Sequence, residues 1–374
     1  MLCGSGEAAT VNDSDECTHQ FGVQRAEFGP IGSADGCHRN YSLSKEIWRS
    51  KHEDVGELIV VENNSAHKST FEPQNWSRTV SASLPLADAE CTDLGDIVDT
   101  ERYPLHDPDH PRMRELVASC RAHLAGNGSA VLHGFLRSAA LEQARAEGLA
   151  LARKTYFSSR KVNAYFTADD PSLPEGDPRR VFMDRTSGFV TRDLIPGDAI
   201  IHRIYVAHAM KRFVAACLGE ERIWEYADPY AGLVQNVMPP GTEQPWHYDT
   251  NEFIVSMMTQ QPNAGGDFEY CPNIRSPGGE NYGGVGAVVR GETRAPINVI
   301  TLQPGDLQLF KGRFSLHRVT LVQGEIDRHT AIFAYSKKPG VIGRLERTRQ
   351  LYGRVSEMHL EAEQKLVRAD NLVD

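Results

Sequence analysis

One stretch of the sequence is more informative than any other: Trp246-His247-Tyr248-Asp249-Thr250-Asn251-Glu252-Phe253. His247 and Asp249 are one residue apart, so on an extended segment their side chains point to the same face. They then offer one imidazole nitrogen and one carboxylate oxygen to a single point. A second histidine from elsewhere would complete the two-histidine, one-carboxylate set that binds Fe(II) and leaves positions open for a co-substrate and O2.

The third ligand that we predict is His317, 68 residues after Asp249 and just past a strand that ends at Phe310. The strand follows the tight turn Pro304-Gly305-Asp306. Such turns bring the later strands of a jelly roll back beside the earlier ones. We therefore expect His317 to reach the same ion as His247 and Asp249, which makes these three residues the predicted metal ligands and catalytic centre.

A co-substrate site is predicted from Arg328 and Thr330, which share one face of the last expected strand. If the co-substrate is a 2-oxo acid, its far carboxylate needs a fixed fork of donors, and a guanidinium group supplies one. Arg328 lies 11 residues after His317, and the hydroxyl of Thr330 can add a hydrogen bond. The order and spacing of all five residues are those that an Fe(II)/2-oxoglutarate oxygenase requires.

From about Glu225 the sequence changes to short apolar runs that are separated by Gly- and Pro-rich breaks. This texture favours an antiparallel sandwich or jelly roll. The expected strands are Gly232 to Val237, His247 to Thr259, Asp267 to Tyr270, Ile297 to Leu302, Leu307 to Lys311 and His329 to Ser336.

Helical patterns precede and follow this region. They are expected from Pro111 to Gly126, from Ser138 through Phe157, from Ile201 to Gly219 and from Thr348 to Asn371, with a strand from Ala130 to Leu136. We expect four parts: a poorly ordered leader (1–85), a helical part with a substrate loop that packs on the core (86–224), the jelly-roll core (225–345) and a C-terminal helix (346–374).

The composition limits the function classes. The 374 residues carry a formal net charge of -10 without a Lys/Arg-rich run, so neither nucleic acid nor a membrane surface is an expected partner. The seven cysteines are scattered and form no C-x-x-C pair, which is typical of reduced thiols. The N-terminus shows no secretory signal pattern and no run of 18 apolar residues occurs, so we expect a cytoplasmic protein.

Four stretches together resemble a known group of enzymes: Trp246 to Gln260, Gly265 to Arg275, Pro304 to Leu307 and Gly312 to Val319. They resemble the Fe(II)/2-oxoglutarate oxygenases of the free-amino-acid halogenase and hydroxylase branch. That branch, a source of secondary-metabolism enzymes, includes fungal oxygenases that close an aziridine on an aliphatic amino acid. The resemblance covers about residues 225–345. It implies an α+β chain with a double-stranded β-helix core (jelly roll or cupin-like) and flanking helices, and it implies Fe(II), 2-oxoglutarate and O2.

The resemblance also bears on the reaction type. The chlorinases of this branch have Gly or Ala two residues after the first histidine, and chloride takes the vacant coordination position. This sequence has Asp249 there. The resemblance therefore implies an oxygenase that releases succinate and CO2, and not a halogenase.

A small free amino acid is the substrate that the resemblance suggests. Its carboxylate needs a partner when buried, and Arg185, from the polar stretch 167–198, is the first candidate. Gln244, three residues before His247, is expected at the polar end of the amino acid, where the chlorinases have a histidine. Thr250, directly after Asp249, is neutral and is also expected to contact the substrate.

Strand alternation adds a second inference about the substrate. If Arg328 and Thr330 face the cavity, so do Ile332 and Ala334, which are both apolar. We therefore expect an aliphatic substrate of the valine or isoleucine type. Three alternatives stay open: oxidative C–N cyclisation instead of hydroxylation, a jelly-roll protein that binds metal and 2-oxoglutarate without turnover, and an oxygenase that acts on a protein.

Overall fold

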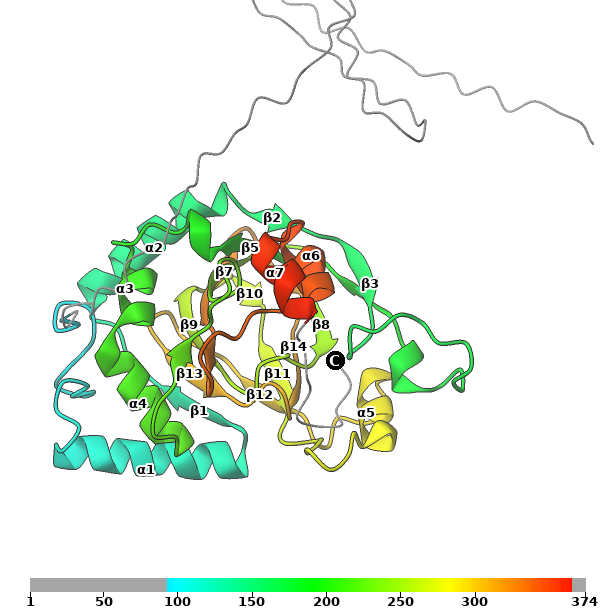
Figure 1. The fold of residues 1–374 in the computed structure, drawn as a ribbon, viewed down its shortest axis with the longest axis horizontal. Coiled ribbons are helices and arrows are strands. Elements are labelled where there is room, and N and C mark those ends of the chain that lie inside the picture. The colour runs from blue at the N-terminus through cyan, green and yellow to red at the C-terminus, as the bar shows by residue number, and fades with distance from the viewer. Residues whose placement is uncertain (1–92, 365–374) are drawn as a thin grey trace, which may run out of the picture. The chain divides into compact units, whose positions relative to one another are not determined.

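The computed structural model describes residues 93–364, drawn in colour in Figure 1. The helices are α1 (Pro111–Gly126), α2 (Ser138–Ala152), α3 (Ile200–Val206), α4 (His208–Leu218), α5 (Tyr282–Val289), α6 (Leu345–Tyr352) and α7 (Glu357–Glu363), with short 3-10 helices η1 (Pro178–Arg180) and η2 (Arg192–Leu194). The predicted leader, residues 1–85, and the last ten residues lie outside the described part.

Most strands belong to two antiparallel sheets. The strands are β1 (Ser129–Leu132), β2 (Tyr156–Phe157), β3 (Arg160–Val162), β4 (Met183–Arg185), β5 (Gly188–Thr191), β6 (Trp224–Glu225), β7 (Leu233–Met238), β8 (Gln244–His247), β9 (Ile254–Gln260), β10 (Ala264–Gly265), β11 (Phe268–Cys271), β12 (Asn298–Ile300), β13 (Leu307–Phe310), β14 (Leu316–Val319), β15 (Val322–Gln323), β16 (Arg328–Phe333) and β17 (Tyr335–Ser336). The larger sheet has the order β1-β13-β9-β16-β7-β5-β2, and the smaller one has the order β12-β11-β14-β8.

The chain crosses repeatedly between the two sheets. β7, β9, β13 and β16 lie in the larger sheet, whereas β8, β11, β12 and β14 lie in the smaller one. Every pair within these two groups of strands is antiparallel, and strands distant in sequence become neighbours, as β8 and β14 do. This is a double-stranded β-helix, and together with the flanking helices it confirms the predicted α+β jelly-roll fold. Strands β1, β2 and β5 from the part before residue 225 extend the larger sheet.

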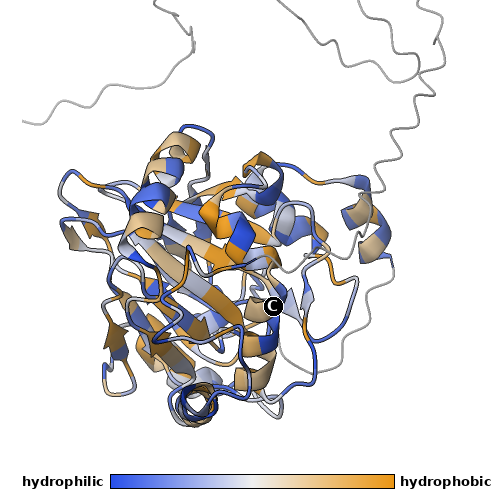
Figure 2. Ribbon diagram, turned by 90° about the vertical axis from the view of Figure 1, so that its left-hand side faces the viewer, coloured by the Kyte–Doolittle hydropathy of each residue, from blue (hydrophilic) through white to orange (hydrophobic). Residues whose placement is uncertain are grey.

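Side chains alternate between the two faces of the larger sheet, so that one face packs on the core and the other lines a cavity. On β16, Ala331 and Phe333 belong to the main hydrophobic core, which also contains buried residues of α1 to α4. The intervening residues, Thr330 and Ile332, line a cavity on the other face. Figure 1 shows α1 to α4 gathered on one side of the sheets, and Figure 2 shows that the central strands are largely apolar while many connecting loops are hydrophilic.

Two of the expected helices end earlier or break. The helix expected from Ser138 through Phe157 stops at Ala152, because Tyr156 and Phe157 pair with β5 at the edge of the larger sheet. Sheet pairing overrides local helix preference there. The helix expected between Ile201 and Gly219 is divided at Ala207, whose ψ of 130° is extended, and Gly219 ends α4 in the left-handed conformation as expected.

The C-terminal part also differs from the single helix that the sequence suggested. It forms two short helices within the described residues, because Gly353, with φ of 70°, ends α6. Helix α5, in the Gly-rich stretch 282–289, was not predicted, and Asn281 caps it by accepting from the Gly284 N–H. None of the described helices is long and apolar enough to cross a membrane.

A buried carboxylate holds the two C-terminal helices. Asp228 is fully buried, and its Oδ1 accepts from the N–H groups of Tyr230 (2.7 Å) and Ala231 (2.8 Å). Its Oδ2 accepts from the N–H of Gly343 (2.9 Å) just before α6 and lies 2.9 Å from Nε2 of His359 in α7. Asp228 therefore ties the start of α6 and the body of α7 to the core.

We predict that Asp228→Ala lowers the free energy of unfolding by about 3 kcal/mol, because it strips partners from several buried donors at once. Urea denaturation followed by circular dichroism measures this. The matched control is Asp184→Ala, since Asp184 forms an exposed pair with Lys161; it is expected to change stability little. Equal losses in both variants would contradict the role given to Asp228.

Candidate metal centre

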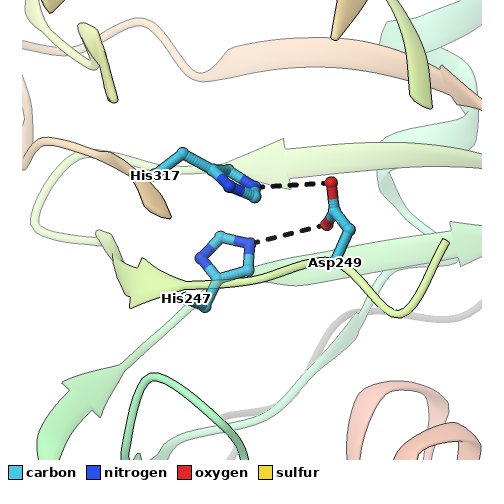
Figure 3. Close-up of side chains that lie close together, drawn as sticks. All are labelled: His247, Asp249 and His317. Atoms are coloured by element: carbon cyan, nitrogen blue, oxygen red, sulfur yellow. Dashed lines mark ion pairs between the residues drawn. The ribbon is translucent and has the colours of Figure 1, made fainter. Parts of the chain in front are cut away.

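The three predicted ligands converge on one point. His247 is the last residue of β8, and His317 lies directly opposite it on the neighbouring strand β14. Nε2 of His247 is 3.9 Å from Oδ1 of Asp249, and Nε2 of His317 is 3.5 Å from Oδ2 (Figure 3). One donor atom from each of the three residues lies within 4.8 Å of the others, a spacing that can hold a metal ion.

The route by which Asp249 reaches the centre differs from the expectation. The strand expected from His247 to Thr259 was wrong for residues 248–253, because β8 ends at His247 and β9 begins at Ile254. Asp249 is held in a loop by its backbone N–H, which donates to the carbonyl oxygen of Gly312 (3.1 Å). His317 lies past β13, as expected, on a further strand, β14, that was not among the expected strands.

Both histidines are oriented in the same way. Nδ1 of His247 lies 2.8 Å from the carbonyl oxygen of Pro245, and Nδ1 of His317 lies 2.9 Å from that of Ser315. A carbonyl oxygen can only accept, so each Nδ1 carries the proton and Nε2 is left as the lone-pair donor. Burial, together with the nearby His317, holds the pKa of His247 well below its usual range. Its ring is therefore in the neutral form that binds metals.

Asp249 is matched to a glycine. A Cβ on Gly312 would overlap Oδ2 of Asp249, so only a residue without a side chain leaves room for the carboxylate. Burial acts to raise the pKa of Asp249, but its interactions with His317, His247 and Arg347 outweigh it, so the pKa lies below its usual value. The group is an ionised ligand at neutral pH.

A cavity of about 190 Å³ adjoins the three ligands, and the predicted co-substrate residues line it. Arg328 is buried; its Nε donates to the carbonyl oxygen of Gly266 (2.9 Å) and its Nη1 to Oγ1 of Thr330 (2.7 Å). Burial lowers the pKa of Arg328 to about 10, against the charge of Asp267, so it stays a cation at neutral pH. Among the described residues, no carboxylate forms an ion pair with it.

Four of the five predicted substrate residues also line this cavity: Gln244, Thr250, Ile332 and Ala334. The fifth, Arg185, does not. It is fully buried at the end of β4, where its Nη2 donates to Oγ of Ser158 (2.7 Å). Its Nε and Nη1 have no hydrogen-bond partner within the described residues, so its role stays a prediction.

Several residues at the site were not predicted from the sequence. The cavity wall also includes Arg347, Leu351 and Tyr352 of α6 and Arg344, the residue just before this helix. The ring of Phe166 packs edge-on against His247, with 5.8 Å between ring centroids. Only Gly312 carried a local signal, since a glycine between a strand and a ligand segment suggests close approach.

Comparison with known proteins places the chain in a family. A family model described as Halogenase D matches residues 114–349, and the chain belongs to this family. No curated protein matches the sequence.

Solved structures with similar folds are distant. A 2OG-Fe(II) oxygenase family oxidoreductase from Burkholderia pseudomallei is 17% identical, with a TM-score of 0.39 over 60% of this chain and 92% of that one. A prolyl-4-hydroxylase from Pseudomonas putida is 16% identical, with a TM-score of 0.37 over 58% and 97%. The α-ketoglutarate-dependent epimerase SnoN from nogalamycin biosynthesis is 11% identical, with a TM-score of 0.43 over 59% and 83%. Similarity at this level specifies neither substrate nor reaction.

The residues present fit the predicted cofactor and co-substrate. Two imidazoles and one carboxylate whose ligand atoms lie within 4.8 Å of one another are a donor set for Fe(II). Arg328, a buried cation without a carboxylate partner among the described residues, fits the distal carboxylate of 2-oxoglutarate.

We predict that Gly312→Ala weakens metal binding about 10- to 100-fold, because the new methyl group displaces the Asp249 carboxylate. Calorimetric titration with Co(II), an air-stable substitute for Fe(II), measures the affinity. Gly126→Ala is the matched control, since a Cβ there meets no atom within 4 Å. Unchanged Co(II) affinity in Gly312→Ala would contradict the role of the glycine.

Proposed function

We propose that this protein is an Fe(II)- and 2-oxoglutarate-dependent oxygenase that oxidises an unactivated C–H bond of a small free amino acid of the aliphatic type. The single observation that carries the proposal is the carboxylate of Asp249 between the two histidines, beside a cavity that holds Arg328. The family match supports the class of enzyme.

Asp249 favours oxygenation over halogenation. A halogenase of this type needs a coordination position for chloride where an oxygenase has its carboxylate ligand. Here the carboxylate fills that position and has the room to do so, because Gly312 faces it. Its pKa lies below the usual value, so it is a charged ligand that chloride would have to displace.

Each part of the site has a separate task. When bound, Fe(II) together with 2-oxoglutarate and O2 supplies the power to break an aliphatic C–H bond, with release of succinate and CO2. His247, Asp249 and His317 hold the metal from one side of the cavity. Arg328 and Thr330 bind and orient the distal carboxylate of 2-oxoglutarate. The surrounding apolar side chains keep water from the reacting groups.

The cavity wall supports an aliphatic substrate. Phe189, Val234, Ile332, Leu351 and Tyr352 line it and pack together in one apolar cluster. Asp249 has the only carboxylate among the described residues of this wall, so a substrate with a second ammonium group would find no free anionic partner there. The volume of about 190 Å³ is smaller than the roughly 300–1,000 Å³ of pockets for drug-sized ligands, and suits a small molecule better than a protein loop.

Oxidative C–N cyclisation is the second candidate, because it needs the same ligands and the same placement of the substrate. In hydroxylation the oxidised carbon gains oxygen. In cyclisation the substrate amine attacks that carbon instead. The two outcomes differ in product mass, by the gain of one oxygen atom or the loss of two hydrogen atoms. This candidate is supported by the segments around His247, Asp249 and His317, which resemble those of aziridine-forming oxygenases.

We predict that succinate release in the presence of Fe(II), 2-oxoglutarate and ascorbate is stimulated by L-valine or L-isoleucine when all twenty amino acids are compared. Mass spectrometry of the product then separates hydroxylation from cyclisation. Asp249→Ala, which lacks the carboxylate ligand, is expected to release no succinate above background. The proposal fails if no free amino acid stimulates the wild-type protein.

We also predict that Arg328→Met weakens 2-oxoglutarate binding about 100-fold, because it removes one partner of a buried charge pair. Titration of the Fe(II)-loaded protein with 2-oxoglutarate in the absence of O2 gives the affinity. Arg294→Met serves as the control, since Arg294 is itself exposed and does not line the cavity. An unchanged affinity in Arg328→Met would assign the 2-oxoglutarate carboxylate to another residue.

A further inference from the structure

We infer that Arg347 of α6 binds the carboxylate of the amino-acid substrate and so fixes which end of the substrate faces the metal. The inference rests on the proposed function and names a residue for it. Arg347 lines the cavity that contains the three metal ligands, and it also lines a second cavity of about 300 Å³ that is enclosed by residues 164–168 and α6. It therefore lies where the two cavities meet.

The guanidinium group of Arg347 is held in a defined position. Its central carbon lies 3.0 Å from the centroid of the Phe166 ring, and that ring in turn packs edge-on against His247. Phe166 has φ of 57°, a left-handed conformation that non-glycine residues seldom adopt outside constrained sites. The chain thus maintains an unusual backbone conformation at the residue that stacks Arg347 beside a metal ligand.

The positive charge of Arg347 also supports its role in binding the substrate carboxylate. Arg347 is a cation on the same cavity wall as His247 and Asp249. A cation this close to the metal ligands attracts an anion to the same place. The substrate carboxylate is the anion that the proposed reaction brings there.

Arg328 and Arg347 serve different parts of the cavity. Leu351 and Tyr352, from the same helix as Arg347, pack with Ile332 on β16. Ile332 is four residues from Arg328, or roughly 13 Å along the strand. Arg328 therefore binds 2-oxoglutarate at one part of the wall and Arg347 binds the substrate at another, and the apolar cluster on the same wall accepts an alkyl side chain.

Two other arginines are weaker candidates. Arg344 lines both cavities as well, but its Nη2 already lies 3.5 Å from the carboxylate of Glu363. Arg185 is fully buried and is not part of the wall of either cavity. Among these arginines, Arg347 combines a place in both cavity walls with direct packing against the residue that touches His247.

The inference is tested by comparing two proteins, the wild type and Arg347→Met, each with two ligands, an amino acid and its carboxamide. The Fe(II)- and 2-oxoglutarate-loaded protein is titrated without O2 by calorimetry, with L-valine, L-isoleucine and their carboxamides, which lack the carboxylate. In the wild type we expect each carboxamide to bind about 10- to 100-fold more weakly than its amino acid. In Arg347→Met the affinity for the amino acid should fall by the same factor, while the affinity for the carboxamide should not change. Arg347→Lys keeps the charge and should give an intermediate loss.

Arg349→Met is the matched control, because Arg349 lies on the same helix, pairs with Glu346 and lines neither cavity. Every variant is also titrated with 2-oxoglutarate, whose unchanged affinity shows an intact metal site. If amino acid and carboxamide weaken equally in Arg347→Met, or if the carboxylate-specific loss occurs in Arg185→Met instead, the inference is overturned. If the wild type binds 2-oxoglutarate but neither amino acid, the proposed substrate class fails and Arg347 loses this role with it.

Discussion

The close approach of the Asp249 carboxylate to Gly312 is the contact on which the metal centre depends. The two histidines are neighbours because β8 and β14 pair in register, and that pairing follows from the jelly-roll topology. The carboxylate has no such support from a strand, because the chain leaves β8 directly after His247. One backbone hydrogen bond to Gly312 and the missing side chain of that glycine bring it into place.

The same strand alternation builds both the core and the site. Along β16, one set of side chains packs under the helices and the other set faces the cavity, so a residue cannot move to the site without opening the core. Burial of Arg328 on this strand is energetically unfavourable, because the cation has only neutral partners among the described residues. Its pKa of about 10 shows that burial works against the charge. Binding of an anionic co-substrate would relieve that cost.

Sequence patterns and the family resemblance together predicted the fold class and the three residues that meet in space, and period-two alternation predicted the cavity face of β16. They were not sufficient for the loop at Asp249, since the apolar residues after it resemble a continuing strand, or for the helix breaks at Ala207 and Gly353. The wall from α6 was missed for a different reason. Arg347 reaches the site only through folding, where it packs on Phe166, and no spacing in the sequence records a contact between residues so far apart in the chain.

The family match leaves the reaction open, and the space around position 249 supports the oxygenase reaction that we propose. Membership of the Halogenase D family by itself leaves both halogen transfer and oxygenation open. A vacant coordination position would need a small residue at 249 and would make no demand on position 312. This chain has a carboxylate at 249 and, 63 residues later, a glycine whose Cβ would collide with it. The absent side chain at position 312 leaves the space that the carboxylate at position 249 occupies, as expected for a site built around a carboxylate ligand. Such a ligand set is better suited to the proposed oxygen transfer or cyclisation than to chloride binding.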